Sequence, residues 1–247
     1  MNTGQQLMVE INGCELKVAT RGSGVNTYVL IPGIGVSPRY FQPLADVLAT
    51  VGIVHEVELP GFGSTKAPRR RVPIHEFGLL VRQALAEAGA GPAVLVGHSM
   101  GCQIAAEMTA AVPALTKGLV LLGPTVNCAE RGALLQGFRL LQDTLREPPR
   151  VNAIVFSDYV RSGPRWYLRT LPEMLRHRVE DVLARIDVPT IILRGERDPI
   201  VPRSWVQTLA AASPAVRIAD IAGEAHVLMY RRPRTVAAYC EEVAARG

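Results

Sequence analysis

The stretch that decides the fold is Ala93-Val94-Leu95-Val96-Gly97-His98-Ser99-Met100-Gly101-Cys102. Its four leading apolar residues predict a buried strand, and the helix formers at 103–111 predict a helix directly after the Gly-x-Ser-x-Gly motif. A turn this tight strains the apex residue, Ser99, and needs small residues where strand and helix approach. Ordinary glycine turns can carry the same motif. The flanking strand and helix favour instead a functional serine whose hydroxyl projects above the sheet, beside the unpaired amide of Met100 at the helix start.

The length and composition predict one soluble globular domain. The 247 residues are 48% hydrophobic and 20% charged, and no apolar run is long enough to span a membrane. Residues 1–16 include several polar side chains and lack the apolar core of a secretion signal. The cysteines are scattered without metal-ligand spacing, at Cys14, Cys102, Cys128 and Cys240. We therefore expect reduced thiols, a cytoplasmic location and no bound metal.

The positive charge is dispersed along the chain. The net charge is +5, and nearly all of the basic residues are arginines. Nucleic-acid binding usually requires a concentrated basic stripe, so we expect no nucleic-acid partner. One basic run, Arg69-Arg70-Arg71, lies in a loop between prolines. A solvated surface is its simplest interpretation, and attraction of anionic ligands is the alternative.

The hydrophobic pattern predicts an α/β fold with a mostly parallel, eight-stranded sheet. Apolar runs indicate strands near residues 7–11, 15–20, 27–31, 53–59, 93–96, 118–122, 189–193 and 216–221. Helical spacing indicates helices near 38–49, 74–88, 103–111, 134–145 and 233–245, with one or two more within 166–185. Strands without polar alternation are typical of a parallel sheet covered by helices on both faces, and the opening hairpin adds antiparallel strands at one edge.

The regular alternation stops after the sixth strand. Residues 125–180 contain helical patterns but no clear strand, and they predict a small helical cap over the carboxyl edge of the sheet, where open α/β folds place their sites. The predicted organisation is therefore a core of residues 1–124 and 181–247 with a cap of residues 125–180.

A serine nucleophile needs a base, and the base needs an acid that orients it. Of the five histidines, His226 lies in a loop directly after the last strand, whereas His98 neighbours the serine and its side chain is expected to diverge from it. Two carboxylates follow the seventh strand, Asp198 and Glu196. Either could reach the histidine from that position.

The chain resembles the α/β-hydrolase fold family in five linked motifs. They are Pro32-Gly33-Ile34-Gly35, Leu59-Pro60-Gly61-Phe62-Gly63-Ser64, Gly97-His98-Ser99-Met100-Gly101, the segment from Gly195 through Asp198 to Pro202, and Gly223 to His226. The resemblance implies that Ser99 is the nucleophile, His226 the general base and Asp198 its orienting partner. It also implies an oxyanion hole formed by the amides of Met100 and Ile34. Pro32 replaces a histidine that the family usually has, and Glu58 replaces a frequent aspartate.

The resemblance implies a serine hydrolase without a cofactor. An apex serine argues against the dehalogenases and epoxide hydrolases of the family, which use aspartate. We expect cleavage of a carboxylic ester, lactone or thioester of a small to medium substrate by a monomer or homodimer. The alternatives are a C–C bond hydrolase, a biosynthetic lyase or cyclase, and a non-enzymatic ligand-binding member.

The substrate pocket is expected to draw on the loops and the cap. The predicted lining residues are His98, Phe138, Tyr159, Trp166, Val201 and Val227. Five cap arginines offer a possible contact with an anionic substrate group, although exposed surface is their simpler interpretation: Arg161, Arg165, Arg169, Arg176 and Arg178.

Overall fold

The computed structural model describes residues 4–247, so residues 1–3 of the predicted core lie outside the described chain. The strands are β1 (Gln5–Ile11), β2 (Cys14–Gly22), β3 (Asn26–Ile31), β4 (Gly52–Glu58), β5 (Ala93–His98), β6 (Thr116–Leu122), β7 (Thr190–Gly195) and β8 (Val216–Ile221). The α-helices are α1 (Gln42–Leu48), α2 (Ile74–Glu87), α3 (Met100–Ala111), α4 (Ala133–Thr144), α5 (Pro149–Ser162), α6 (Pro164–Arg176), α7 (Val179–Leu183), α8 (Arg203–Ala211), α9 (Leu228–Arg231) and α10 (Pro233–Ala244).

The strands form a single sheet in the order β1-β2-β4-β3-β5-β6-β7-β8. The pairs β1–β2 and β2–β4 are antiparallel, and all other neighbours are parallel. This arrangement confirms the predicted eight-stranded, mostly parallel sheet with antiparallel strands at one edge. β5 lies inside the sheet and all six of its residues are buried, because a central parallel strand has helices on both of its faces.

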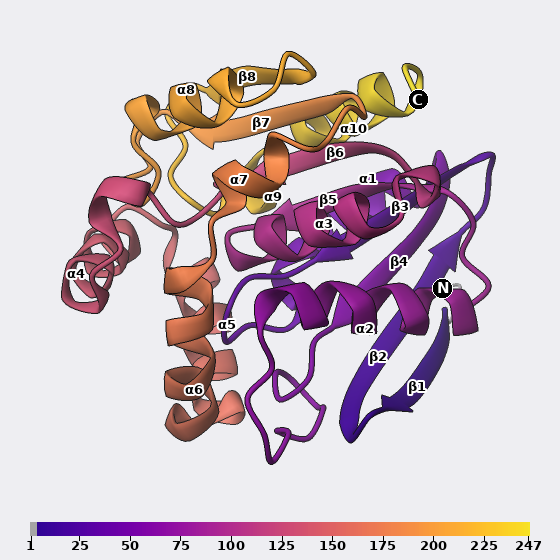
Figure 1. Ribbon diagram of the computed structural model, residues 1–247, viewed down its shortest axis with the longest axis horizontal. Coiled ribbons are helices and arrows are strands. Elements are labelled where there is room, and N and C mark those ends of the chain that lie inside the picture. The colour runs from indigo at the N-terminus through magenta and orange to yellow at the C-terminus, as the bar shows by residue number, and fades with distance from the viewer. Residues whose placement is uncertain (1–3) are drawn as a thin grey trace.

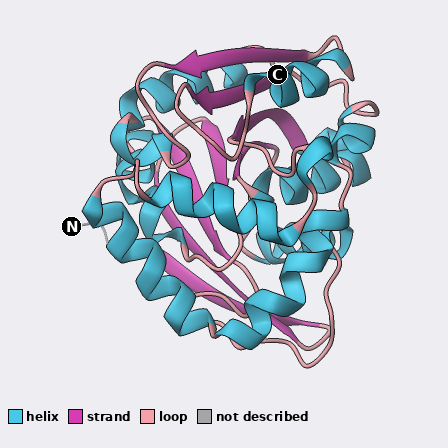
Figure 2. Ribbon diagram, turned by 90° about the vertical axis from the view of Figure 1, so that its left-hand side faces the viewer, coloured by secondary structure: helices cyan, strands magenta, loops and turns pink. Residues whose placement is uncertain are grey.

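Helices cover both faces of the sheet (Figures 1 and 2). On one face, Phe77 of α2 and Ile104 of α3 pack into a core cluster that also includes residues of α7 and α8. On the other face, Leu44 of α1 and Val236 of α10 pack into a second cluster. The apolar stripes of these helices are therefore buried against the sheet.

Between β6 and β7 the chain forms four helices instead of a single crossover. Three of them, α4, α5 and α6, lie at one end of the sheet (Figure 1), and we call residues 133–176 the cap. The fourth helix, α7, packs against α3 and α8, so the predicted boundary at residue 180 falls inside a helix that belongs with the sheet. Helices α5, α8 and α9 were missing from the sequence prediction.

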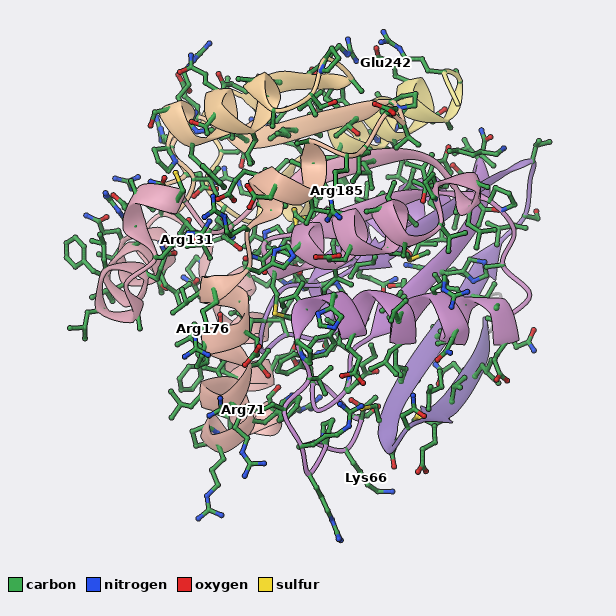
Figure 3. All side chains as sticks on the ribbon, viewed as in Figure 1. Lys66, Arg71, Arg131, Arg176, Arg185 and Glu242 are labelled. Atoms are coloured by element: carbon green, nitrogen blue, oxygen red, sulfur yellow. The ribbon has the colours of Figure 1, made fainter. Side chains whose placement is uncertain are left out.

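The basic side chains are distributed over the surface. Lys66, Arg131 and Arg185 lie on separate parts of the fold (Figure 3). Lys66 pairs with Glu15 at 2.7 Å, and Arg131 pairs with Glu180 at 2.7 Å. Within residues 4–247 no helix combines the length and the apolar character needed to cross a bilayer.

The turn between β5 and α3 is as tight as the sequence predicts. β5 ends at His98, α3 begins at Met100, and Ser99 between them has a φ of 55° and a ψ of −119°. A positive φ is strained for a residue other than glycine. The close packing needs Gly101, because a Cβ atom there would lie 2.1 Å from the carbonyl oxygen of Ile31. The glycine thus allows α3 to approach β3 and keeps the turn in place.

We expect Gly101→Ala to lower the free energy of unfolding by about 1–3 kcal/mol, because the added methyl group forces α3 away from the sheet. Urea denaturation followed by circular dichroism measures the change. Gly137→Ala is the matched control, since this helical glycine has no neighbouring atom within 4 Å of an added Cβ and alanine is the better helix former. Equal stability of the Gly101→Ala variant and the wild type would contradict the close-packing explanation.

Candidate active site

Asp198 and His226 meet at the carboxyl edge of the sheet. Asp198 follows β7 and His226 follows β8, and neighbouring parallel strands bring such loops together. His226 Nδ1 lies 2.7 Å from Asp198 Oδ2. The other carboxylate oxygen of Asp198 accepts the amide hydrogens of Ile200 and Val201 at 2.8 and 3.1 Å. These bonds fix the carboxylate so that it can orient the imidazole.

Glu196, the rival acid, binds a different partner. Its Oε2 accepts the amide hydrogen of Gly223 at 2.9 Å. Of the two carboxylates that follow β7, the structure therefore pairs Asp198 with His226, and Glu196 holds the start of the next loop.

Ser99 and His226 line one cavity of about 340 Å³ beneath the cap. Gly33 and Ile34 line it as well, while Met100, the first residue of α3, is buried behind Ser99. The first amide of a helix has no acceptor within the helix, so that of Met100 is available to a ligand. Among the described residues, the hydrogen bond that engages the His226 imidazole is the one to Asp198. Catalytic hydrogen bonds to a nucleophile often tighten only when substrate is bound.

His98 connects the segments around the cavity. Its Nδ1 lies 2.9 Å from the Tyr40 hydroxyl and its Nε2 lies 3.2 Å from the His226 carbonyl oxygen. Because a carbonyl only accepts, Nε2 must carry the proton, and Nδ1 then accepts from Tyr40. Tyr40 in turn accepts the amide hydrogen of Gly33 at 2.9 Å. A buried chain of hydrogen bonds thus joins the loop after β3, the end of β5 and the loop after β8.

The two buried histidines differ in charge state. Burial lowers the pKa of His98 well below its ordinary value, and the neighbouring His226 lowers it further. Burial would also lower the pKa of His226, but Asp198, Asp143 and Glu147 outweigh that effect and raise it to about 9. His98 is therefore neutral, whereas His226 is strongly basic.

Sequence reasoning missed the polar side chains that the cap places in the cavity, namely Gln136, Asp143 and Glu147. Asp143 Oδ1 accepts the amide hydrogen of His226 at 3.1 Å, and Glu147 Oε1 accepts that of Val227 at 2.7 Å. Gln136 and Asp143 are seven residues apart, which places them on one face of α4, and this spacing was a signal that could have found them. Glu147 lies just beyond the helix, and no local pattern pointed to it.

The structure separates the predicted pocket residues into two groups. His98, Tyr159 and Val227 line the cavity, whereas Phe138, Trp166 and Val201 are not among its lining residues. Phe138 is 53% exposed, because α4 turns its polar face inward. Trp166 packs near Phe62 and donates its indole hydrogen to the Pro60 carbonyl at 2.9 Å. Val201 instead donates its backbone amide hydrogen to Asp198 Oδ1.

Apart from His226, the charged side chains that line the cavity are acidic. Asp143 and Glu147 lie on its wall, and no arginine of the described chain does, including the five cap arginines singled out in the sequence. Most of the remaining wall is apolar, with Val151, Leu171 and Met174 among its residues. Within residues 4–247 no group of three or more histidine, cysteine, aspartate or glutamate side chains is arranged to hold a metal ion.

Known proteins resemble this chain in both sequence and fold. A pimeloyl-[acyl-carrier protein] methyl ester esterase from Sodalis glossinidius is 28% identical over 247 residues, covering 87% of this chain and 91% of that protein. The biotin biosynthesis bifunctional protein BioHC from Cellvibrio japonicus is 25% identical over 232 residues, covering 83% of this chain. The match extends over 45% of BioHC, so this chain spans less than half the length of that relative.

Solved structures show the same architecture. Est816, described as an N-acyl homoserine lactone degrading enzyme, matches with a TM-score of 0.84 and 20% sequence identity, over 96% of this chain and 99% of its own. At that identity the likeness concerns the fold. The sequence profile of the alpha/beta hydrolase family matches residues 28–239. Because this match covers most of the sequence, the chain belongs to the alpha/beta hydrolase family.

Proposed function

We propose that this protein is a serine hydrolase that cleaves a carboxylic ester, lactone or thioester of a small to medium substrate. The observation that carries the proposal is that Ser99 and His226, whose imidazole is paired with Asp198, line one largely apolar cavity of about 340 Å³. This volume suits a small organic ligand. The relatedness to a methyl ester esterase supports ester hydrolysis in general.

In the proposed reaction, Ser99 Oγ attacks the carbonyl carbon of the ester while His226 Nε2 removes the hydroxyl proton. Asp198 stabilises the resulting imidazolium through Nδ1. The tetrahedral intermediate collapses to an acyl-enzyme, and the leaving alcohol takes the proton from His226. Water then attacks the acyl group by the same route, which releases the acid and restores Ser99.

The negative oxygen of the tetrahedral intermediate would face the amides of Met100 and Ile34. Each such donor contributes about 3 kcal/mol to the reduction of the barrier. Tyr40 supports this arrangement because its hydroxyl holds the amide of Gly33, the residue before Ile34. The resemblance to the family left open how this loop is held with Pro32 in place of a histidine, and we assign that role to Tyr40.

We expect Ser99→Ala to lower kcat on a short p-nitrophenyl ester by about 10⁶-fold, because the variant lacks the hydroxyl that forms the acyl-enzyme in the proposed reaction. Ser204→Ala, a change at an exposed position of α8, serves as the control and should keep full activity. Thermal unfolding verifies that both variants are folded. Full activity of Ser99→Ala would rule out the covalent mechanism.

A serine-directed fluorophosphonate separates the proposed function from its alternatives. Labelling of Ser99 together with turnover of simple esters supports the ester hydrolase. Labelling without turnover of esters would favour a C–C hydrolase, lyase or cyclase that uses the same serine. Absence of both would favour a ligand-binding member of the family.

We expect Tyr40→Phe to lower kcat by about 10- to 100-fold with little change in KM, because the Gly33–Ile34 loop loses its anchor and the oxyanion donor shifts. Steady-state kinetics with the same ester measures the effect. Tyr239→Phe, the same substitution on α10, is the control. An unchanged kcat in Tyr40→Phe would show that the loop is held without the hydroxyl.

A further inference from the structure

The cap binds the backbone of the loop that carries His226. Asp143, near the end of α4, accepts the amide hydrogen of His226, and Glu147, just beyond that helix, accepts the amide hydrogen of Val227. Their exposed fractions are 4% and 7%. Two buried carboxylates thus hold two consecutive amides of one loop, although they come from a segment about 80 residues earlier in the chain.

Buried carboxylates are costly unless they do something that neutral side chains cannot do. Neither Asp143 nor Glu147 forms an ion pair with an arginine or lysine within the described chain, in contrast to Asp158, the third buried carboxylate of the cap, which pairs with Arg39. Serine, threonine or asparagine could accept the same amide hydrogens without charge. The negative charges of Asp143 and Glu147 therefore need a cation nearby to compensate for their burial.

The cation available within the active site is the imidazolium of His226. The titratable groups that act on it come from three segments. Asp198 after β7 and neutral His98 at the end of β5 lie against the ring, and the two cap carboxylates act on it electrostatically. Arg231 of α9 acts on Glu147 from farther away. Carboxylates thus outnumber cations around the ring.

We propose that Asp143 and Glu147 are positioning residues for His226, which fasten its loop to the cap and stabilise the imidazolium that forms when Ser99 is deprotonated. The inference rests on the proposed role of His226 as the base. In this arrangement a cap segment supplies part of the charge environment of the catalytic histidine, and the orienting acid Asp198 shares that task with two further carboxylates.

The electrostatic consequence is an alkaline pH dependence. His226 acts as a base only when neutral, and the surrounding carboxylates raise its pKa to about 9. Burial raises the pKa of Asp143 to about 7, although the neighbouring imidazolium opposes that rise. Asp143 is therefore charged across most of the range in which His226 titrates. We expect kcat/KM of the wild type to rise about tenfold per pH unit from pH 7 and to level off near pH 9.

Asp143→Asn and Glu147→Gln remove the negative charge and keep an oxygen that can accept the amide hydrogen. Loss of a nearby negative charge destabilises the imidazolium, so the pKa of His226 falls. We expect the rising limb of kcat/KM to move to lower pH by about 1 unit in each variant and further in the double variant. Asp143→Ala removes the acceptor too, and its kcat at the plateau should fall as well.

Asp158→Asn is the matched control. Asp158 is also a buried cap carboxylate, but its Oδ2 accepts the amide and hydroxyl hydrogens of Ser37 at 2.9 and 2.7 Å, so it binds the segment after β3 and not the His226 loop. Asp158→Asn should lower the free energy of unfolding but leave the rising limb of kcat/KM at the same pH as in the wild type. A merely structural role of Asp143 and Glu147 would give the same result as this control.

A readout that does not require turnover keeps this proposal separate from the proposed function. The Cε1 proton of His226, assigned by comparison with a His226→Gln variant, is titrated by NMR in the wild type and in the two amide variants. A wild-type pKa well above the ordinary value of about 6.5 that falls in both amide variants supports the proposal. A wild-type pKa at or below the ordinary value, or one that the amide variants leave unchanged, overturns it. Absence of ester turnover with the expected titration would instead contradict the proposed function alone.

Discussion

The buried contact between Asp198 and His226 is the constraint on which the rest of the site depends. An imidazole and a carboxylate lose their hydration when they are buried, and only close pairing with well-directed hydrogen bonds compensates for that loss. The 2.7 Å contact supplies the pairing, and the amides of Ile200 and Val201 occupy the remaining oxygen of Asp198. The contact exists because β7 and β8 are parallel neighbours whose loops leave the sheet at the same edge.

A second set of hydrogen bonds connects the loop after β3 and the end of β5 to the loop that carries His226. His98 is neutral and buried, and it links Tyr40 to the carbonyl of His226. The Tyr40 hydroxyl also accepts the amide hydrogen of Gly33. The strained turn at Ser99 therefore belongs to a network that reaches both neighbouring loops, and the tyrosine hydroxyl holds a loop in which proline stands at position 32.

The cap takes part in the same electrostatic arrangement. Helix α4 directs Gln136 and Asp143 inward and leaves Leu134, Phe138 and Leu141 exposed, the reverse of the usual amphipathic orientation. The inward carboxylates bind the amides of the His226 loop, which need acceptors once they are buried. The inward face of α4 therefore combines these polar contacts with Leu140, which packs against the core.

The sequence by itself determined where the eight strands lie along the chain, the tight turn at Ser99 and the loops that carry Asp198 and His226. These features depend on local patterns, since apolar runs, glycines and prolines act within a few residues of their position. It did not predict α5 or α8, and it placed Phe138 and Trp166 in the pocket. Only the tertiary structure decided which residues surround the cavity. The contacts of Asp143 and Glu147 with the His226 loop join segments about 80 residues apart, and they depend on how the cap folds back over the sheet, which no local pattern encodes.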